Sequence, residues 1–504
     1  MTLLAAAHAP LLNAPLAAID MGSNSFRLEI ATLRRGQYKR LEYLKETVRL
    51  GAGLDEQGLL TEAAMQRGLD CLARFALHLK DCAPRQVRAV ATQTLREAKN
   101  RDAFLQRAES VLGFPIEVIS GREEARLIYA GVARLQASEL PRLVIDIGGR
   151  STEMILGQGR TPVTAESFQV GSVSLSMRFF PEGRFTAEAF RAAQVAAGAE
   201  LEEALSLFDR RHWREALGSS GTVGAVAQVL AGSGVTDGRI TPAALRWCIE
   251  QCIAAGQMDK LKLPGLKEDR RAVVGGGLCI LYTLLTQFGI AELMPTKGAL
   301  RQGVIFDLAE RHAGAAGGSG DMREQSVAAL QQRFGVDLEQ AARVRKLALA
   351  LYKQLQPQAP REAQRELGWA AALHEIGMMV SHHDHHRHSA YLLAHVDAAG
   401  FSQSQLKRLG DLALGQRGGL RKLEAQFADP GFVWQLLALR LAALACHARA
   451  PVSPQALQLA RERQGVRLQL AKGWAQRQPR TLYLLQQELE AWARSGVLSL
   501  RLAA

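Results

Sequence analysis

The sequence AIDMGSNSFR (18–27) places an apolar strand, a carboxylate, a turn of small residues and a second strand within ten positions. Gly22 lets the backbone of the turn approach a ligand closely. Ser23, Asn24 and Ser25 add side-chain hydrogen-bonding groups beside the backbone N–H groups of the turn. Several donors that converge on one point suit a phosphate group. On its own, however, an Asp-x-Gly turn is more typical of an ordinary hairpin.

The pattern occurs twice, which makes a functional interpretation stronger. DIGGRS (146–151) repeats DMGSNS (20–25) as D-x-G-x-x-S, and each copy lies between two apolar strands. The repeat predicts two similar halves that face each other across a cleft and bind a polyphosphate from both sides. Asp20 and Asp146 are then available to hold a divalent cation, which prefers carboxylate oxygens.

Length and charge limit the possible architectures and partners. At 100–200 residues per domain, 504 residues predict about three or four domains. The net charge is +13, and residues 321–504 hold 24 basic against 15 acidic residues. This excess indicates a nucleic acid, a membrane surface or a polyanionic substrate, or else an ordinary solvated basic surface.

The chain carries signs of a cytoplasmic protein. Its six cysteines form no CxxC pair, which indicates reduced thiols. There is no apolar run of 18 residues, so we expect no transmembrane segment.

The hydrophobic pattern predicts an α/β chain up to residue 312 and a mostly helical one beyond it. Ser120 and Glu123 form a predicted capping box at the start of a helix. The turn at 218–222 opens another helix, which is a favourable place for an anion. A linker is predicted at 313–320. The predicted strands are 17–19, 26–32, 39–48, 87–92, 116–119, 143–147, 152–157 and 172–180, and the main predicted helices are 61–79, 101–112, 187–208, 326–334, 338–355, 363–380 and 432–448.

Together these motifs resemble the exopolyphosphatase/guanosine pentaphosphate phosphatase (Ppx/GppA) family, within the superfamily of actin, sugar kinases and heat-shock chaperone ATPases. The resemblance implies two duplicated actin-like (ribonuclease H-like) α/β domains with a cleft, at 1–134 and 135–312. It also implies an α-helical HD-like domain at 321–450 and a small α/β C-terminal domain at 451–504. The motifs are AIDMGSNSFR (18–27), VRLGAGL (48–54), ATQTLREAKN (91–100), ISGREEARLIYAGV (119–132), VIDIGGRSTE (144–153), GSSGTVGA (218–225), KGALRQGV (297–304), LHEIG (373–377) and HHRHSAYLL (385–393).

The resemblance implies that water attacks the terminal phosphoryl group of a phosphate chain. The second Glu of the family's E-E-A-R motif is the expected catalytic base, and here it is Glu124. A carboxylate at a helix N-terminus in a cleft can orient a water molecule for in-line attack. The alternative is that Glu124 is a solvated acid favoured by the helix dipole.

The resemblance also implies a set of metal and phosphate ligands. We expect Mg²⁺, with or without a monovalent cation, bound by Asp20, Asp146 and Glu153. Arg150 departs from the family, which usually has a small residue at that position, so it either narrows the turn or supplies another phosphate contact. The expected phosphate-binding residues are Ser23, Asn24, Ser25, Arg96, Gly148, Gly149, Arg150, Ser151, Thr152, Gly221 and Thr222.

The helical domain resembles the HD phosphohydrolase fold but lacks that fold's full set of metal ligands. The helical pair is His374-Glu375, and His383-Asp384 falls in an expected loop. We therefore expect a degenerate site or a polyanion-binding loop at 382–388, with metal binding in vitro as the alternative.

We expect an exopolyphosphatase acting on inorganic polyphosphate, because HRHSAY (386–391) resembles that branch of the family. The alternative in the same family is a guanosine pentaphosphate 5′-phosphohydrolase. An alternative of another class is a non-hydrolytic sensor of nucleotide or polyphosphate, which the presence of Glu124 beside both turns disfavours; a sugar or acetate kinase is a further one. We also expect a homodimer, and peripheral membrane contact is compatible with the basic C-terminal part.

Overall fold

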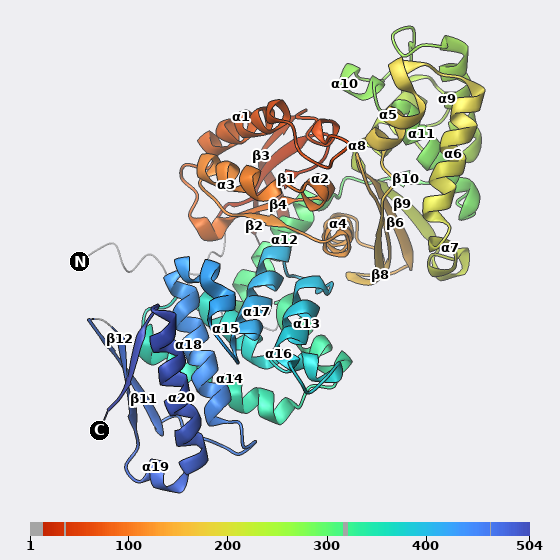
Figure 1. Cartoon of the computed structure of the whole chain (residues 1–504). Coiled ribbons are helices and arrows are strands. Elements are labelled where there is room, and N and C mark those ends of the chain that lie inside the picture. Colours follow the sequence, from red (N-terminus) through yellow and green to blue (C-terminus); the bar gives the residue numbers. More distant parts are fainter. Residues whose placement is uncertain (1–13, 35–36, 316–320, 464, 504) are drawn as a thin grey trace. The chain divides into compact units, whose positions relative to one another are not determined.

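The computed structural model describes residues 14–34, 37–315, 321–463 and 465–503. The chain forms two compact units, Met1–Asp321 and Met322–Ala504 (Figure 1). The finer division into four domains stays a prediction. Within the described residues, no helix has both the length and the apolar character needed to cross a membrane.

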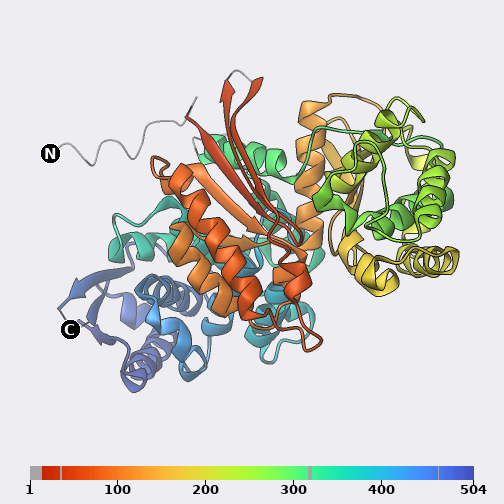
Figure 2. The same cartoon turned by 90° about the horizontal axis from the view of Figure 1, so that it is seen from above.

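The first unit begins with a five-stranded sheet in the order β3-β2-β1-β4-β5. β1 pairs antiparallel with β2 and parallel with β4. Helices α1 and α3 pack together beside this sheet, as Figures 1 and 2 show. We call this part lobe I (16–135). Its elements are β1 (Leu16–Met21), β2 (Phe26–Arg34), β3 (Gln37–Glu46), α1 (Glu62–His78), β4 (Val87–Ala91), α2 (Gln93–Glu97), α3 (Arg101–Leu112), β5 (Ile116–Val118) and α4 (Gly121–Leu135).

A second sheet repeats the same arrangement in the order β8-β7-β6-β9-β10. β6 takes the place of β1, with an antiparallel partner in β7 and a parallel partner in β9. The predicted duplication is therefore confirmed, and we call this part lobe II (142–295). Its elements are β6 (Arg142–Ile147), β7 (Thr152–Gln158), β8 (Thr161–Phe168), α5 (Ser172–Phe179), α6 (Ala187–Leu201), α7 (Ala204–Leu207), β9 (Glu215–Ser219), α8 (Ser220–Gly232), α9 (Pro242–Ala255), α10 (Glu268–Arg271), α11 (Val274–Gln287) and β10 (Met294–Pro295).

Helices α4 and α12 (Leu300–Ala315) pack on each other and contribute to a hydrophobic core that both sheets share. Ala18 of β1 and Val144 of β6 both point into this core. Because strand side chains alternate between faces, Asp20 and Asp146 lie on the same faces as those two residues. Strand periodicity thus turns both aspartates toward the region between the lobes.

One predicted strand is wrong: residues 172–180 form helix α5, and the strand after β7 is β8. Val173 and Leu175 alternate with serines, a spacing that is typical of a strand. Ser176 is nevertheless buried, because its hydroxyl accepts a hydrogen bond of 2.9 Å from the backbone N–H of Gly276. A glycine in α11 lets the two helices approach closely, so small polar residues occupy the buried face of α5.

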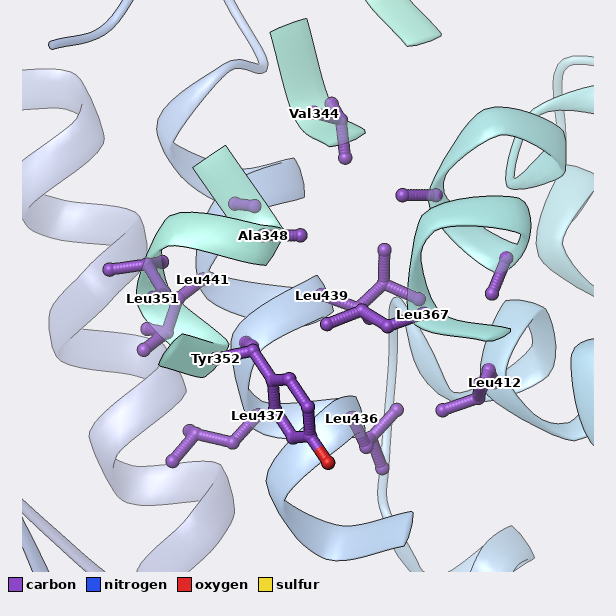
Figure 3. Close-up of a cluster of buried hydrophobic side chains, with 14 of the residues drawn as sticks. Val344, Ala348, Leu351, Tyr352, Leu367, Leu412, Leu436, Leu437, Leu439 and Leu441 are labelled. Carbon is purple, nitrogen blue, oxygen red and sulfur yellow. The ribbon is translucent and has the colours of Figure 1, made fainter. Parts of the chain in front are cut away.

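The second unit is helical and then ends in a small sheet. Leu367, Leu412 and Leu436 converge in its core (Figure 3). The predicted helix 363–380 ends earlier than expected, at Leu373, and a short 3-10 helix, Ile376–Met379, follows. The helices are α13 (Met322–Arg333), α14 (Leu338–Leu355), α15 (Arg361–Leu373), α16 (His385–His395), α17 (Gln403–Gly415), α18 (Pro430–Ala445), α19 (Trp474–Arg477) and α20 (Pro479–Ser495).

The C-terminal sheet has the order β11-β12-β13, with β11 (Leu457–Glu462), β12 (Gly465–Leu470) and β13 (Ser499–Leu502). Trp492 of α20 and Leu500 of β13 belong to the same hydrophobic core as the preceding helices. The appendage is therefore continuous with the helical part of the unit. Most of the predicted linker at 313–320 lies outside the described residues.

Candidate active site

The two D-x-G-x-x-S turns meet in the first unit. A Cβ atom placed on Gly149 would lie 3.1 Å from Cβ of Ser23, so the second turn lies directly against the first. Each turn needs its glycine because the backbone there passes close to a carbonyl oxygen of the same turn. A Cβ on Gly22 would lie 3.2 Å from the Ser25 carbonyl oxygen, and one on Gly148 would lie 3.1 Å from that of Ser151. The repeat in sequence is thus a repeat in geometry.

Both turns line a cleft of about 320 Å³. The described lining includes the predicted residues Asp20, Ser23, Asn24, Ser25, Glu124, Asp146, Gly148, Gly149, Ser151, Gly221 and Thr222.

Polar groups around the first turn are buried without a partner. Asn24 Nδ2, Ser25 Oγ and Thr94 Oγ1 make no hydrogen bond with the described part of the protein. Unpaired buried donors cost free energy, and they are usually satisfied by water or a ligand. Asn24 and Ser25 line the cleft, so oxygen atoms of a phosphate group bound there could satisfy these two.

Glu124 lies in the first turn of α4 and is only 7% exposed. Its Oε2 accepts a hydrogen bond of 2.8 Å from Nη1 of Arg96. Arg96 is therefore the partner of the predicted base, and it does not belong to the described cleft lining. Burial raises the pKa of Glu124 to about 7, Arg96 opposes this rise, and repulsion from Asp20 and Asp146 adds to it. A carboxyl with that pKa is suited to act as a general base near neutral pH.

The start of α4 differs in one respect from the prediction. Ser120 caps the helix, since its hydroxyl accepts a hydrogen bond of 3.2 Å from the backbone N–H of Glu123. The carboxylate of Glu123, however, accepts two hydrogen bonds from Arg126, of 2.7 and 2.8 Å, so the predicted capping box is wrong. Arg126 also donates to Asp307 of α12 at 2.6 Å. A buried ion-pair network therefore binds α4 to α12, and it directs Glu123 away from the cap.

Arg150 reaches from lobe II to lobe I. Its Nη2 lies 2.6 Å from Oε2 of Glu97, and its Nη1 donates to the Gly51 carbonyl oxygen at 3.3 Å. Gln93 continues this network, because its Nε2 donates to Glu97 at 2.6 Å and its Oε1 accepts from Arg96. Arg150 does not belong to the described cleft lining. Through Glu97 and Gln93 it connects the second turn to Arg96, the residue that binds Glu124.

Two other predicted residues follow the second turn and bind neighbouring parts of lobe II. The hydroxyl of Thr152 donates to the Val170 carbonyl oxygen at 2.6 Å, and Glu153 Oε1 accepts from the Ser167 hydroxyl at 2.8 Å. Neither belongs to the described cleft lining. Burial raises the pKa of Glu153 well above its usual range, and repulsion from Glu124 and Asp146 raises it further.

The turn at the start of α8 closes another side of the cleft. Ser220 adopts a φ of 95°, which is uncommon for a residue other than glycine. The Thr222 hydroxyl donates to the Ile147 carbonyl oxygen at 3.0 Å, which holds this turn beside β6. A Cβ on Gly221 would lie 2.1 Å from Nη2 of Arg270, so the absence of a side chain lets that cation lie over the turn.

The cleft also carries cations that the sequence analysis missed. Arg27 was identifiable in principle, because the β1–β2 hairpin pairs it with Asp20, and Arg27 Nη1 lies 3.0 Å from Asp20 Oδ2. Of the others, Lys297 and Arg301 lie in the motif KGALRQGV (297–304), and the rest come from two further segments of the chain. The described basic residues of the lining are Arg27, Lys45, Lys267, Arg270, Lys297 and Arg301. Their excess over the three acids of the lining favours a highly charged anionic ligand.

Asp20 and Asp146 fit a Mg²⁺ ion that also binds phosphate. Both carboxylates line the cleft, and burial raises the pKa of Asp146 to about 6, with a contribution from repulsion by Asp20. A divalent cation would relieve this crowding of negative charge. No group of three metal-binding side chains occurs among the described residues, but Mg²⁺ commonly uses only one or two carboxylates with waters and phosphate oxygens. Metal binding stays a prediction.

The histidines of the second unit form no metal centre within the residues that the structure describes. His374 is buried, and its Nδ1 lies 2.7 Å from the Ala371 carbonyl oxygen. Glu375 lies 3.2 Å from Arg449. His383 and Asp384 lie in the predicted loop, before α16.

Comparison with known proteins identifies the family to which this chain belongs. Residues 30–312 match the Ppx/GppA phosphatase family, and residues 322–490 match Ppx/GppA phosphatase, domain III. The chain belongs to the Ppx/GppA phosphatase family. It is accordingly a phosphoric anhydride hydrolase with actin-like domains.

Relatives within the Ppx/GppA family resemble the chain over most of its length. It is 37% identical over 470 residues, which are 92% of this chain and 94% of the relative, to guanosine-5′-triphosphate,3′-diphosphate pyrophosphatase of Aeromonas hydrophila. It is 36% identical to the Vibrio vulnificus protein of the same name, over 95% of this chain and 96% of that one. Among solved structures, an exopolyphosphatase from Cytophaga hutchinsonii is 25% identical with a TM-score of 0.54, covering 59% of this chain and 98% of that one.

Proposed function

We propose that this protein hydrolyses guanosine 5′-triphosphate 3′-diphosphate at its terminal 5′ phosphoanhydride bond. The observation that carries the proposal is Glu124, buried beside two phosphate-binding turns with its carboxylate held by Arg96. The relatives that are 36–37% identical over nearly the whole chain support this substrate better than the polyphosphate expected from residues 386–391.

In the proposed reaction Glu124 accepts a proton from a water molecule, which attacks the terminal phosphorus atom. The bond to the bridging oxygen breaks, and inorganic phosphate leaves the guanosine tetraphosphate product. The turns at 22–25 and 148–151 bind the non-bridging oxygens, and Arg27 and Arg301 balance their charge. When bound, Mg²⁺ held by Asp20 and Asp146 would neutralise further charge on the phosphate oxygens.

Exopolyphosphatase activity is a second candidate, since the similar solved structure from Cytophaga hutchinsonii is that of an exopolyphosphatase. The test is phosphate release from guanosine pentaphosphate and from long-chain polyphosphate, measured side by side with Mg²⁺. We expect kcat/KM for the nucleotide to exceed that for polyphosphate, counted per chain end. A clear preference for polyphosphate would select the second candidate, and no release from either would reject both.

A further inference from the structure

Arg301 has no role in the proposed reaction beyond its charge, yet several neighbouring groups contact its side chain. It is the second residue of α12, within KGALRQGV (297–304), and its side chain is 12% exposed. It lines the cleft, and Nη1 lies 3.9 Å from Oδ2 of Asp20. A cation at this point faces the carboxylate of the first phosphate-binding turn.

The other side of the same guanidinium binds a fully buried carboxylate. Glu29 of β2 has no exposed surface, and its Oε2 accepts a hydrogen bond of 3.2 Å from Arg301 Nε. Gln302 Nε2 donates to both oxygens of Glu29, at 2.7 and 2.9 Å, and the Tyr38 hydroxyl donates to Oε1. Burial and Glu29 both raise the pKa of Tyr38 strongly, so this hydroxyl stays a donor. A buried carboxylate is stable only with such partners.

An aromatic ring also restrains the guanidinium. Arg301 Cζ lies 5.1 Å from the centre of the Tyr43 ring, and Tyr43 itself lines the cleft. With Nε bound to Glu29 and Cζ over the Tyr43 ring, the guanidinium is oriented before a ligand arrives. Nη1 is then left on the side of Asp20 and the cleft. A donor that is already oriented loses no free energy to reorganisation during the reaction.

We propose that Arg301 contacts the transferred phosphoryl group, and that the buried Glu29 is the positioning residue that aims it. The inference rests on the phosphoanhydride hydrolysis proposed above. Arg27 differs from Arg301, because it donates directly to Asp20 at 3.0 Å, whereas Arg301 binds the buried Glu29 through Nε. The alternative is that Glu29 and Arg301 form an ion pair that only stabilises the fold.

A double-mutant cycle separates these two roles. Arg301→Ala should lower kcat/KM about 10²-fold, as loss of one oriented donor to a developing charge does. Glu29→Gln should lower it about 10-fold, because a neutral amide no longer fixes Arg301. The double variant should match Arg301→Ala, since Glu29 acts through Arg301. Arg40→Ala is the matched control, because Arg40 lies over the same Tyr43 ring at 5.4 Å but is exposed and outside the described lining. The kcat/KM of this variant should stay within about twofold of the wild-type value.

For the same set of variants, calorimetry measures the affinity for inorganic tripolyphosphate, and thermal unfolding checks that each variant is folded. If the wild type hydrolyses neither substrate, the proposed function fails, while the tripolyphosphate cycle still tests Arg301. If Glu29→Gln does not fold, Tyr38→Phe replaces it, because this change removes one bond to Glu29 without touching Arg301. Losses that multiply in the double variant, or an Arg301→Ala variant with wild-type affinity and turnover, would overturn the inference.

Discussion

Arg96 Nη1 donates a 2.8 Å hydrogen bond to Glu124 Oε2, and this contact joins the helix after β4 to the first turn of α4. A buried carboxylate without a cation would be protonated near neutral pH. The Arg96 guanidinium therefore keeps the base available, and the predictions begin with these two residues.

Glu124→Gln preserves size but removes the proton acceptor. We expect turnover to fall about 10²- to 10⁴-fold while substrate affinity is largely retained. Steady-state kinetics and equilibrium binding measure the two effects separately. The exposed Glu188→Gln is the control. A Glu124→Gln variant within about tenfold of wild type would show that another group is the base.

The pH dependence follows from the pKa of Glu124, which burial raises to about 7. The ionised form is the base, so kcat/KM should fall as the pH falls below about 7 and level off above it. Arg96 lowers this pKa, so Arg96→Gln should move the midpoint to higher pH. Because the substrate titrates identically in both proteins, the difference between the two profiles isolates the enzyme group. An unchanged midpoint in Arg96→Gln would contradict the assignment.

Asp20→Asn and Asp146→Asn should each raise the Mg²⁺ concentration needed for half-maximal rate by about tenfold or more, because an amide is a poorer ligand for a hard cation. Titration of activity with Mg²⁺ measures this. Asp209→Asn removes a carboxylate that pairs with Arg211 and does not belong to the described cleft lining, and it serves as the control. Unchanged Mg²⁺ dependence in both cleft variants would make the aspartates structural residues of the turns.

Arg150→Ala should lower kcat/KM by less than about tenfold, because Arg150 connects the lobes through Glu97 and does not belong to the described cleft lining. Glu97→Ala should have a similar effect, and the double variant should be no worse than either single one. A loss of about 10²-fold or more confined to Arg150→Ala would instead support the direct phosphate contact that the sequence suggested.

The sequence was sufficient for the duplicated fold because both D-x-G-x-x-S turns are local hairpins. Each depends on a glycine that approaches a carbonyl oxygen three residues later, as in Gly22 and Ser25. Such short-range geometry is encoded within six residues, and the opposing positions of the two turns follow from the repeat.

The rest of the site depends on contacts between distant segments. Lys45 and Arg270 reach the same cleft from β3 and α10, more than 200 residues apart. The Glu123 carboxylate binds Arg126 and does not complete the helix cap, because Arg126 also binds Asp307 of α12 in a buried ion-pair network. Neither periodicity nor motif spacing contains this information, since it arises only when α12 packs against α4.

The central claim is that a water molecule activated by Glu124 attacks the terminal phosphorus atom. Its most direct test is to follow the oxygen atom of that water into the products. Guanosine pentaphosphate is hydrolysed in water enriched in heavy oxygen, and the products are analysed by mass spectrometry. Attack of a Glu124-activated water on the terminal phosphorus predicts heavy oxygen in the released inorganic phosphate, an unlabelled guanosine tetraphosphate, and loss of both products in Glu124→Gln. Label in the nucleotide product, release of pyrophosphate, or unchanged labelling in Glu124→Gln would contradict it.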